Sequence, residues 1–133
     1  MVDLGSRPAT PSPVGEIPDP WPTVEDALEA ATLVSNKARE MYGEGLIRTL
    51  LYGSRARGDH DRYSDLDILL VLKPEAYDPR EGKVSELLDY FWIELPYDLK
   101  WVKLSVMSAT VEQVENWDTT FYRNVRADAL EVT

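Results

Sequence analysis

The stretch LYGSRARGDHDRYSDLDILLVL, residues 51–72, contains the densest group of candidate catalytic and binding residues in this 133-residue chain. Apolar residues lead into Gly53 and Ser54, a polar loop follows, and Asp65 and Asp67 stand at the head of a second apolar run. Short apolar runs bounded by glycine and polar residues predict strands. A long polar loop between two strands that a tight hairpin could join is typical of a binding site.

Asp65 and Asp67 form an Asp-x-Asp pair, which a strand displays on one face while Leu66 points the other way. Two ionised carboxylates about 6 Å apart repel by about 3 kcal/mol at an effective dielectric of about 20. A divalent cation removes this repulsion, and Mg²⁺ usually takes one or two protein carboxylates and completes its shell with water and phosphate oxygens. The pair therefore predicts a site for Mg²⁺ or Mn²⁺.

Gly53 and Ser54 follow the predicted strand 46–52 and precede three residues that can form a short helical turn. Glycine allows the backbone to approach a ligand closely. Ser54 suits the N-cap position of the turn, where free N–H groups and the hydroxyl would face a triphosphate. The glycine–serine step and the aspartate pair thus describe one phosphate and metal site.

A Gly-Ser step, ten intervening residues and an Asp-x-Asp pair, together with Ala56-Arg57-Gly58 and Ser64-Asp65, resemble the minimal nucleotidyltransferases of the DNA polymerase beta superfamily. Looser similarity extends from about residue 23 to the C-terminus. The resemblance implies transfer of a nucleoside monophosphate from ATP or another NTP to a hydroxyl group. It also implies that the Ala-Arg-Gly segment shapes the nucleotide-binding turn, where Arg57 either contacts phosphate or holds the aspartate pair through a salt bridge.

The amino-acid composition limits the classes of substrate and partner, and the cellular compartment, that we expect for this chain. Acidic residues outnumber basic ones by 24 to 14, which gives a net charge of −10 and argues against long DNA or RNA as a substrate. The absence of cysteine excludes disulfides and thiolate metal sites. The longest aliphatic run is much shorter than the ~18 residues that span a bilayer, and the N-terminus lacks a signal-peptide core, so we expect a cytoplasmic protein. Small members of the family often resemble antitoxins, which implies a helical toxin as a possible protein partner.

Six of the nine prolines lie in residues 1–22, which we expect to form a flexible arm, disordered or loosely docked. The domain then spans residues 23–133. Thr23, with Asp26 as a capping-box partner, predicts the start of a helix that ends near Gly43. In the central loop, His60 is the only histidine, and its charged neighbours predict that it is solvated.

Asp78, Pro79 and Glu81 predict the N-cap, first turn and capping box of a second helix. Residues 97–107 follow as a third strand, and a strand–helix–strand crossover is nearly always right-handed with parallel strands. The apolar residues expected to form the core-facing stripe of the second helix are Val84, Leu87, Leu88, Phe91 and Leu95. We therefore predict a mixed α/β domain, a small mixed sheet flanked by helices, similar to the catalytic core of nucleotidyltransferases.

Parallel pairing would bring Asp98, at the start of the third strand, to the same end of the sheet as the aspartate pair. Asp98 is then the candidate third carboxylate, which would bind a second cation and activate the acceptor hydroxyl. The family has an acid embedded among apolar residues here, whereas this chain has Lys100 at that point and Asp98 one pleat earlier. Either Asp98 acts from a shifted position, or the third acid is lost. The second case predicts a catalytically degenerate module that works by binding a nucleotide or a partner.

The remaining residues predict packing elements. Thr110 and Gln113 form a capping box for a third helix, an amphipathic piece surrounds Phe121 and Val125, and residues 130–132 can add an edge strand.

Overall fold

The computed structural model describes residues 18–94 and 104–132, which fold as a mixed α/β domain, as the sequence predicts. The elements in chain order are α1 (Val24–Tyr42), η1 (Gly43–Gly45), β1 (Leu46–Tyr52), α2 (Ser54–Arg57), β2 (Leu66–Leu72), η2 (Pro74–Ala76), α3 (Gly82–Glu94), β3 (Leu104–Thr110), α4 (Val111–Asn116), α5 (Thr120–Asp128) and β4 (Leu130–Val132).

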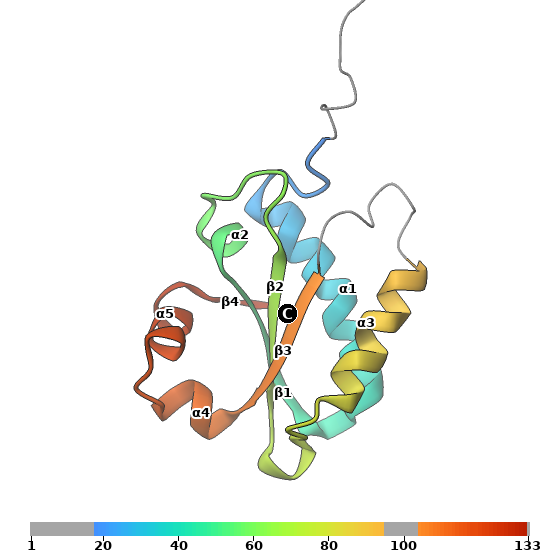
Figure 1. Ribbon diagram of the computed structural model, residues 1–133, viewed down its shortest axis with the longest axis vertical. Helices are drawn as coiled ribbons and strands as arrows, with labels where there is room; N and C mark the ends of the chain where they lie inside the picture. The colour runs from blue at the N-terminus through green and yellow to red at the C-terminus, as the bar shows by residue number, and fades with distance from the viewer. Residues whose placement is uncertain (1–17, 95–103, 133) are drawn as a thin grey trace, which may run out of the picture.

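The four strands form one mixed sheet in the order β3-β2-β1-β4 (Figure 1). β1 runs antiparallel to both β2 and β4, while β2 and β3 are parallel. The parallel pairing across the α3 crossover confirms the expected topology, and β4 confirms the predicted edge strand. The end of β1, the start of β2 and α2 lie at the same end of the sheet (Figure 1).

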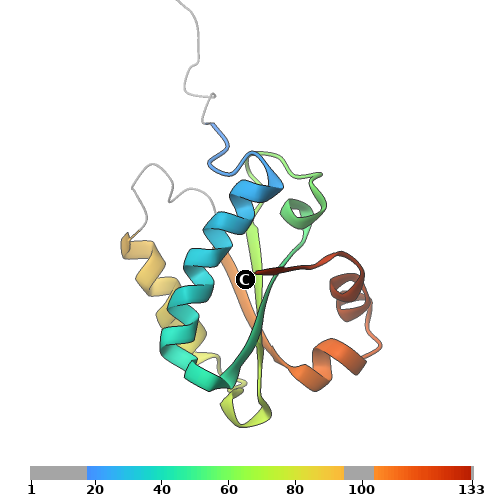
Figure 2. The same ribbon diagram turned by 180° about the vertical axis from the view of Figure 1, so that it is seen from behind.

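Helices cover both faces of the sheet, α1 and α3 one face and α4 and α5 the other (Figures 1 and 2). Side chains of β2 alternate between the two layers: Ile68 and Leu70 join the α1 and α3 core, whereas Leu69 and Val71 pack with α4 and α5. All four are fully buried, and burying such a side chain stabilises the fold by about 1.5–3 kcal/mol. The near-continuous apolar run of β2 is thus that of a central strand.

The predicted first helix is confirmed at both ends. The Thr23 hydroxyl accepts a hydrogen bond from the Asp26 N–H, and the Asp26 carboxylate accepts one from the Thr23 N–H, which completes the capping box. Gly43, at a φ of 57°, ends the helix. On the buried side of the helix, Ser35 donates a 2.8 Å hydrogen bond to Thr49 of β1, so a polar contact as well as packing holds the helix to the sheet.

The second predicted helix begins later than the sequence suggests, because Glu81 has a φ of 53° and is therefore not helical. Asp78 instead forms a turn, in which its Oδ1 accepts from the Arg80 N–H at 2.9 Å, and α3 starts at Gly82. The Glu81 carboxylate does not close a capping box; it accepts from the N–H and hydroxyl of Ser108 at 2.9 and 3.0 Å. The long-range bonds to β3 thus replace the local cap.

The apolar stripe of α3 is confirmed over its described residues. Val84, Leu87 and Phe91 are buried, and Leu88 packs against the same core, while Leu95 lies outside the described residues.

The third strand ends later than predicted. It continues to Thr110 because its last three residues pair with the last three of β2, and its predicted first part, 97–103, lies outside the described residues. The helix that follows begins with the predicted capping box of Thr110 and Gln113. Among the described helices, none is long and apolar enough to cross a membrane.

The last residues of the predicted arm are folded against the domain. The Trp21 N–H donates to Asp19 at 2.9 Å, and the Trp21 ring lies 5.3 Å from the guanidinium of Arg55. Residues 1–17 lie outside the described residues, and for them the flexible arm stays a prediction.

Candidate active site

Gly53 is the point at which β1 turns into α2, and it lies directly against Asp67. Its φ of 79° falls in a region that residues with a β-carbon rarely adopt. A β-carbon at this position would also overlap Oδ2 of Asp67. The missing side chain therefore allows the turn and the Asp67 carboxylate to lie directly against each other.

The N-cap of α2 is Gly53 and not Ser54, which corrects the sequence prediction. The carbonyl of Gly53 already accepts hydrogen bonds from the N–H groups of Ala56 and Arg57, at 3.1 and 3.2 Å, so Ser54 is the first helical residue. The physical reason is the positive φ of Gly53, which turns the chain one residue earlier. Ser54 is half-buried and directly follows Gly53 in the turn.

The two aspartates lie at the start of β2, Asp65 directly before the strand and Asp67 as its second residue. Leu66 is buried in the α1 and α3 core, whereas Asp65 and Asp67 are half-buried on the other side of the chain. Asp67 shares its face of the sheet with Leu69 and Val71, and therefore with the layer of α4 and α5. The carboxylates thus lie at the rim of the sheet rather than in its core.

Two hydroxyl residues flank Asp67 across the sheet. The register pairs Asp67 with Tyr52 of β1 on one side and with Ser105 of β3 on the other. Paired residues in adjacent strands share a face, so the three side chains form a row. The Tyr52 hydroxyl donates to Sδ of Met107 at 3.4 Å, and its ring packs edge-on against Phe121 at 5.5 Å.

Burial raises the pKa of Tyr52 to about 12, and the negative charge of Asp67 acts in the same direction. A hydrogen bond with the Ser105 side chain partly offsets these effects. The phenol therefore remains protonated at neutral pH and is a hydrogen-bond donor in the site. We did not single out Tyr52 or Ser105 from the sequence; the signal for Tyr52 was its place directly before the glycine, at the end of a strand.

The third carboxylate of the sequence analysis is not placed by the structure, because Asp98 and Lys100 lie outside the described residues. The parallel pairing that motivated Asp98 is present, but the residue of β3 that pairs with Asp67 is Ser105. Within residues 18–94 and 104–132, no three acidic or histidine side chains gather to hold a metal ion. The described donors for a cation are therefore the two aspartates.

These donors fit a Mg²⁺ or Mn²⁺ ion. Carboxylate oxygens are the protein ligands that both ions prefer, and Mg²⁺ completes its coordination shell with water and phosphate oxygens.

Arg57 forms ion pairs with two acidic residues outside the aspartate pair. Its side chain is exposed and donates from Nε to Asp59 at 3.1 Å, and its Nη1 lies 4.0 Å from Asp128 of α5. The guanidinium thus ties α2 to its own loop and to α5. Both the phosphate contact and the salt bridge to the aspartate pair stay predictions, and the ion pairs that the structure describes for Arg57 are those with Asp59 and Asp128.

The side chain of His60 is largely buried, which corrects the expectation of a solvated side chain. Its side chain is only 7% exposed, and Nε2 lies 3.0 Å from the Pro22 carbonyl and 3.5 Å from the Asp19 carboxylate. The reason is the packing of residues 18–22 over the loop, a contact between segments far apart in the sequence.

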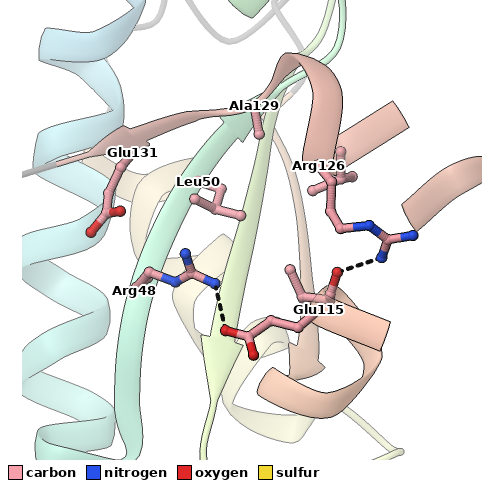
Figure 3. A pocket seen from close by; sticks show the side chains of 8 residues that line it. Arg48, Leu50, Glu115, Arg126, Ala129 and Glu131 are labelled. Atoms are coloured by element: carbon pink, nitrogen blue, oxygen red, sulfur yellow. Dashed lines mark hydrogen bonds and ion pairs between the residues drawn. The ribbon is translucent and has the colours of Figure 1, made fainter. Parts of the chain in front are cut away.

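A separate hollow of about 260 Å³ lies between β1, β4, α4 and α5 (Figure 3). Its charged residues are largely paired: Arg48 lies 3.6 Å from Glu115, and Arg126 donates to the carbonyls of Val114 and Trp117 at 2.7 and 3.0 Å. Asp67 is not among the residues that line it. The hollow is therefore distinct from the aspartate site.

Comparison with known proteins agrees with the geometry. The sequence profile of a family described as "Nucleotidyltransferase domain" matches residues 33–125, which include the whole of the aspartate site. The Methanocaldococcus jannaschii protein named "Putative protein adenylyltransferase MJ0141" is 30% identical over 76 residues, which cover 54% of this chain and 75% of that protein. A crystal structure of a "putative nucleotidyltransferase" from Sulfolobus solfataricus matches with a TM-score of 0.49 and 18% identity, over 90% of each chain. The chain belongs to the nucleotidyltransferase domain family.

Proposed function

We propose that this protein is a metal-dependent nucleotidyltransferase that moves a nucleoside monophosphate from ATP or another NTP to a hydroxyl group. One observation carries the proposal: Gly53 and Asp67 lie together so closely that only a glycine fits. This arrangement joins a turn suited to phosphate with a carboxylate suited to a divalent cation, although the two residues lie 14 positions apart in the sequence.

In this reaction the acceptor oxygen forms a bond to the α-phosphorus of the NTP, and the bond from that phosphorus to the pyrophosphate oxygen breaks. Pyrophosphate leaves, and the acceptor proton passes to a base. Mg²⁺ or Mn²⁺ would neutralise charge on the phosphate oxygens. Asp65 and Asp67 would hold the cation, Gly53 and Ser54 would seat the triphosphate, and Asp98 would activate the acceptor. Tyr52 can donate a hydrogen bond at the same edge.

A protein hydroxyl is the acceptor that we favour. The name of the Methanocaldococcus jannaschii relative, a protein adenylyltransferase, supports AMP as the group and a protein as the acceptor. The net charge of −10 suits a basic partner, and a helical toxin, with this chain as its antitoxin, is the partner that we propose.

The test is incubation of the protein with α-labelled ATP, Mg²⁺ and whatever protein copurifies with it. We expect label on the copurifying protein, and none when Asp65→Asn and Asp67→Asn are combined. Asp118→Asn, at an exposed position before α5, is the matched control and should label normally. Equal labelling by the double variant and the parent would exclude the aspartate pair from the reaction.

A second candidate function is a catalytically degenerate module that binds a nucleotide or a partner. The observation that favours it is the pairing of Asp67 with Ser105, which places a hydroxyl and not a third carboxylate beside Asp67 in β3. Nucleotide binding by the parent without any transfer to a copurifying partner would support this function over the first.

A further inference from the structure

Arg55 is completely buried, although it lies on the short surface helix α2. Arginine is almost never fully buried unless it is paired, because removing its charge from water costs several kcal/mol after relaxation. Arg57, two residues later in the same turn, is exposed. Burial of one of these two neighbouring arginines therefore indicates a specific role for Arg55.

The guanidinium of Arg55 binds two segments of the chain that are distant in sequence, the loop 61–64 and the N-terminal residues 19–21. Nε donates to the Ser64 carbonyl at 3.0 Å, and Nη2 donates to the Asp61 carbonyl at 3.1 Å. Nη1 donates to the Trp21 carbonyl at 2.8 Å and to the Asp19 carboxylate at 3.0 Å. The rigid planar fork of arginine can make such a set of bonds, whereas the single ammonium of lysine cannot.

These bonds connect the two halves of the aspartate site. Arg55 follows Ser54 directly, and Ser64 precedes Asp65 directly, so the bond between Arg55 and Ser64 fixes the end of the phosphate turn against the start of the aspartate pair. The bond to Asp61 holds the loop between them.

The N-terminal segment supplies the negative charge for this buried arginine. Asp19 is 16% exposed and is the carboxylate that pairs with Arg55, and the Trp21 ring lies over the guanidinium at 5.3 Å. His60 adds a contact from the loop to the same carboxylate at 3.5 Å. Loss of the Asp19 charge would leave a buried cation without its partner, which favours opening of the loop.

We propose that Arg55 is a positioning residue for the active site and that Asp19 controls it, so that the N-terminal segment sets the spacing between the phosphate turn and the aspartate pair. This inference rests on the proposed function, because it assigns a role in the same site. It predicts that the metal ion and ATP strengthen each other's binding only while the Asp19 carboxylate keeps the Arg55 side chain in place.

The test measures the affinity for ATP with and without Mn²⁺ by isothermal titration, well below the melting temperature of each variant. In the parent we expect Mn²⁺ to tighten ATP binding. In Asp19→Asn we expect this enhancement to fall by about five-fold or more, a typical size for coupling between two sites. Asp19→Glu, which keeps the carboxylate, should restore part of it, and Asp118→Asn, which removes an exposed ion pair with Arg123 outside the site, should leave it unchanged.

A purely structural role would lower the melting temperature of Asp19→Asn without changing the enhancement in the folded protein, and that result would overturn the proposal. Amide hydrogen exchange provides a readout that needs no nucleotide: in Asp19→Asn the amides of residues 61–65 should exchange faster, while those of α1 stay protected. Unchanged exchange at 61–65 would also overturn it. A parent that binds no ATP with Mn²⁺ would instead contradict the proposed function, and the exchange result would still decide whether Asp19 orders the loop.

Discussion

Gly53 and Asp67 are mutually dependent in this structure, since a β-carbon on residue 53 would occupy the space of the Asp67 Oδ2 atom. Gly53 directly follows Tyr52, the last residue of β1, and Tyr52 is paired with Asp67 in the antiparallel register of β1 and β2. The sheet pairing therefore fixes the distance between the phosphate turn and the metal carboxylate. The following predictions test this arrangement.

Gly53→Val should abolish nucleotide binding, because a branched side chain would displace the Asp67 carboxylate and would also require a strained backbone at a φ of 79°. Gly43→Val is the matched control, since Gly43 also has a positive φ but has no heavy atom near the position of its β-carbon. Titration calorimetry with Mg²⁺ and ATP measures both variants. Similar losses of affinity in the two would mean that backbone strain, and not contact with Asp67, is responsible.

Asp65→Asn combined with Asp67→Asn should remove the part of thermal stabilisation by ATP that depends on Mg²⁺ or Mn²⁺. A ligand that binds only the folded state at 100 times its Kd raises the free energy of unfolding by about 2.7 kcal/mol. Melting curves with metal, with ATP and with both reveal the metal-dependent part. If the double variant and the parent shift equally on titration, the cation binds elsewhere.

Ser54→Ala should weaken ATP binding while changing the free energy of unfolding by less than about 0.5 kcal/mol, as for most partly exposed substitutions. The reason is that Gly53, and not Ser54, is the N-cap of α2. Thr23→Ala, which removes a genuine capping side chain, should by contrast cost about 1 kcal/mol. Denaturant unfolding compares the two variants, and an equal cost in both would restore a capping role for Ser54.

Tyr52→Phe should make the protein less sensitive to alkaline pH. The pKa of Tyr52 is raised from 10.0 to about 12, so the folded state holds this proton more tightly than the unfolded chain does. The resulting stability is complete below pH 10.0 and is lost as the pH rises through about 12. Denaturant unfolding at several pH values across this range should show a shallower decline for the variant. Burial also raises the pKa of Tyr42 and Tyr122, so a smaller decline remains.

Asp98→Ala should remove nucleotidyl transfer and spare much of the nucleotide binding, because Asp98 is proposed to activate the acceptor. Labelling with α-labelled ATP measures the transfer. Label that survives in this variant would exclude the assigned role.

Ser105→Asp should tighten Mn²⁺ binding by placing a carboxylate beside Asp67. Metal titration compares the variant with the parent. Unchanged metal affinity would show that Ser105 does not face the cation.

The sequence determined the features that depend on near neighbours in the chain. The apolar run of β2, the capping boxes at Thr23 and Thr110, and the Gly-Ser and Asp-x-Asp motifs follow from side-chain periodicity and local hydrogen bonding. The parallel pairing of β2 and β3 was also predictable, because the handedness of strand crossovers leaves few alternatives. These features were sufficient for the fold class and for the family.

Only the tertiary structure decided which distant residues meet. Ser105 became the partner of Asp67 through the register of β3, and Arg55 and His60 became buried because residues 18–22 pack over their loop. The composition of the loop alone suggested charged groups in solvent. The physical reason is that a buried charge depends on partners that the rest of the fold brings to it, and no local pattern in the chain records where those partners lie.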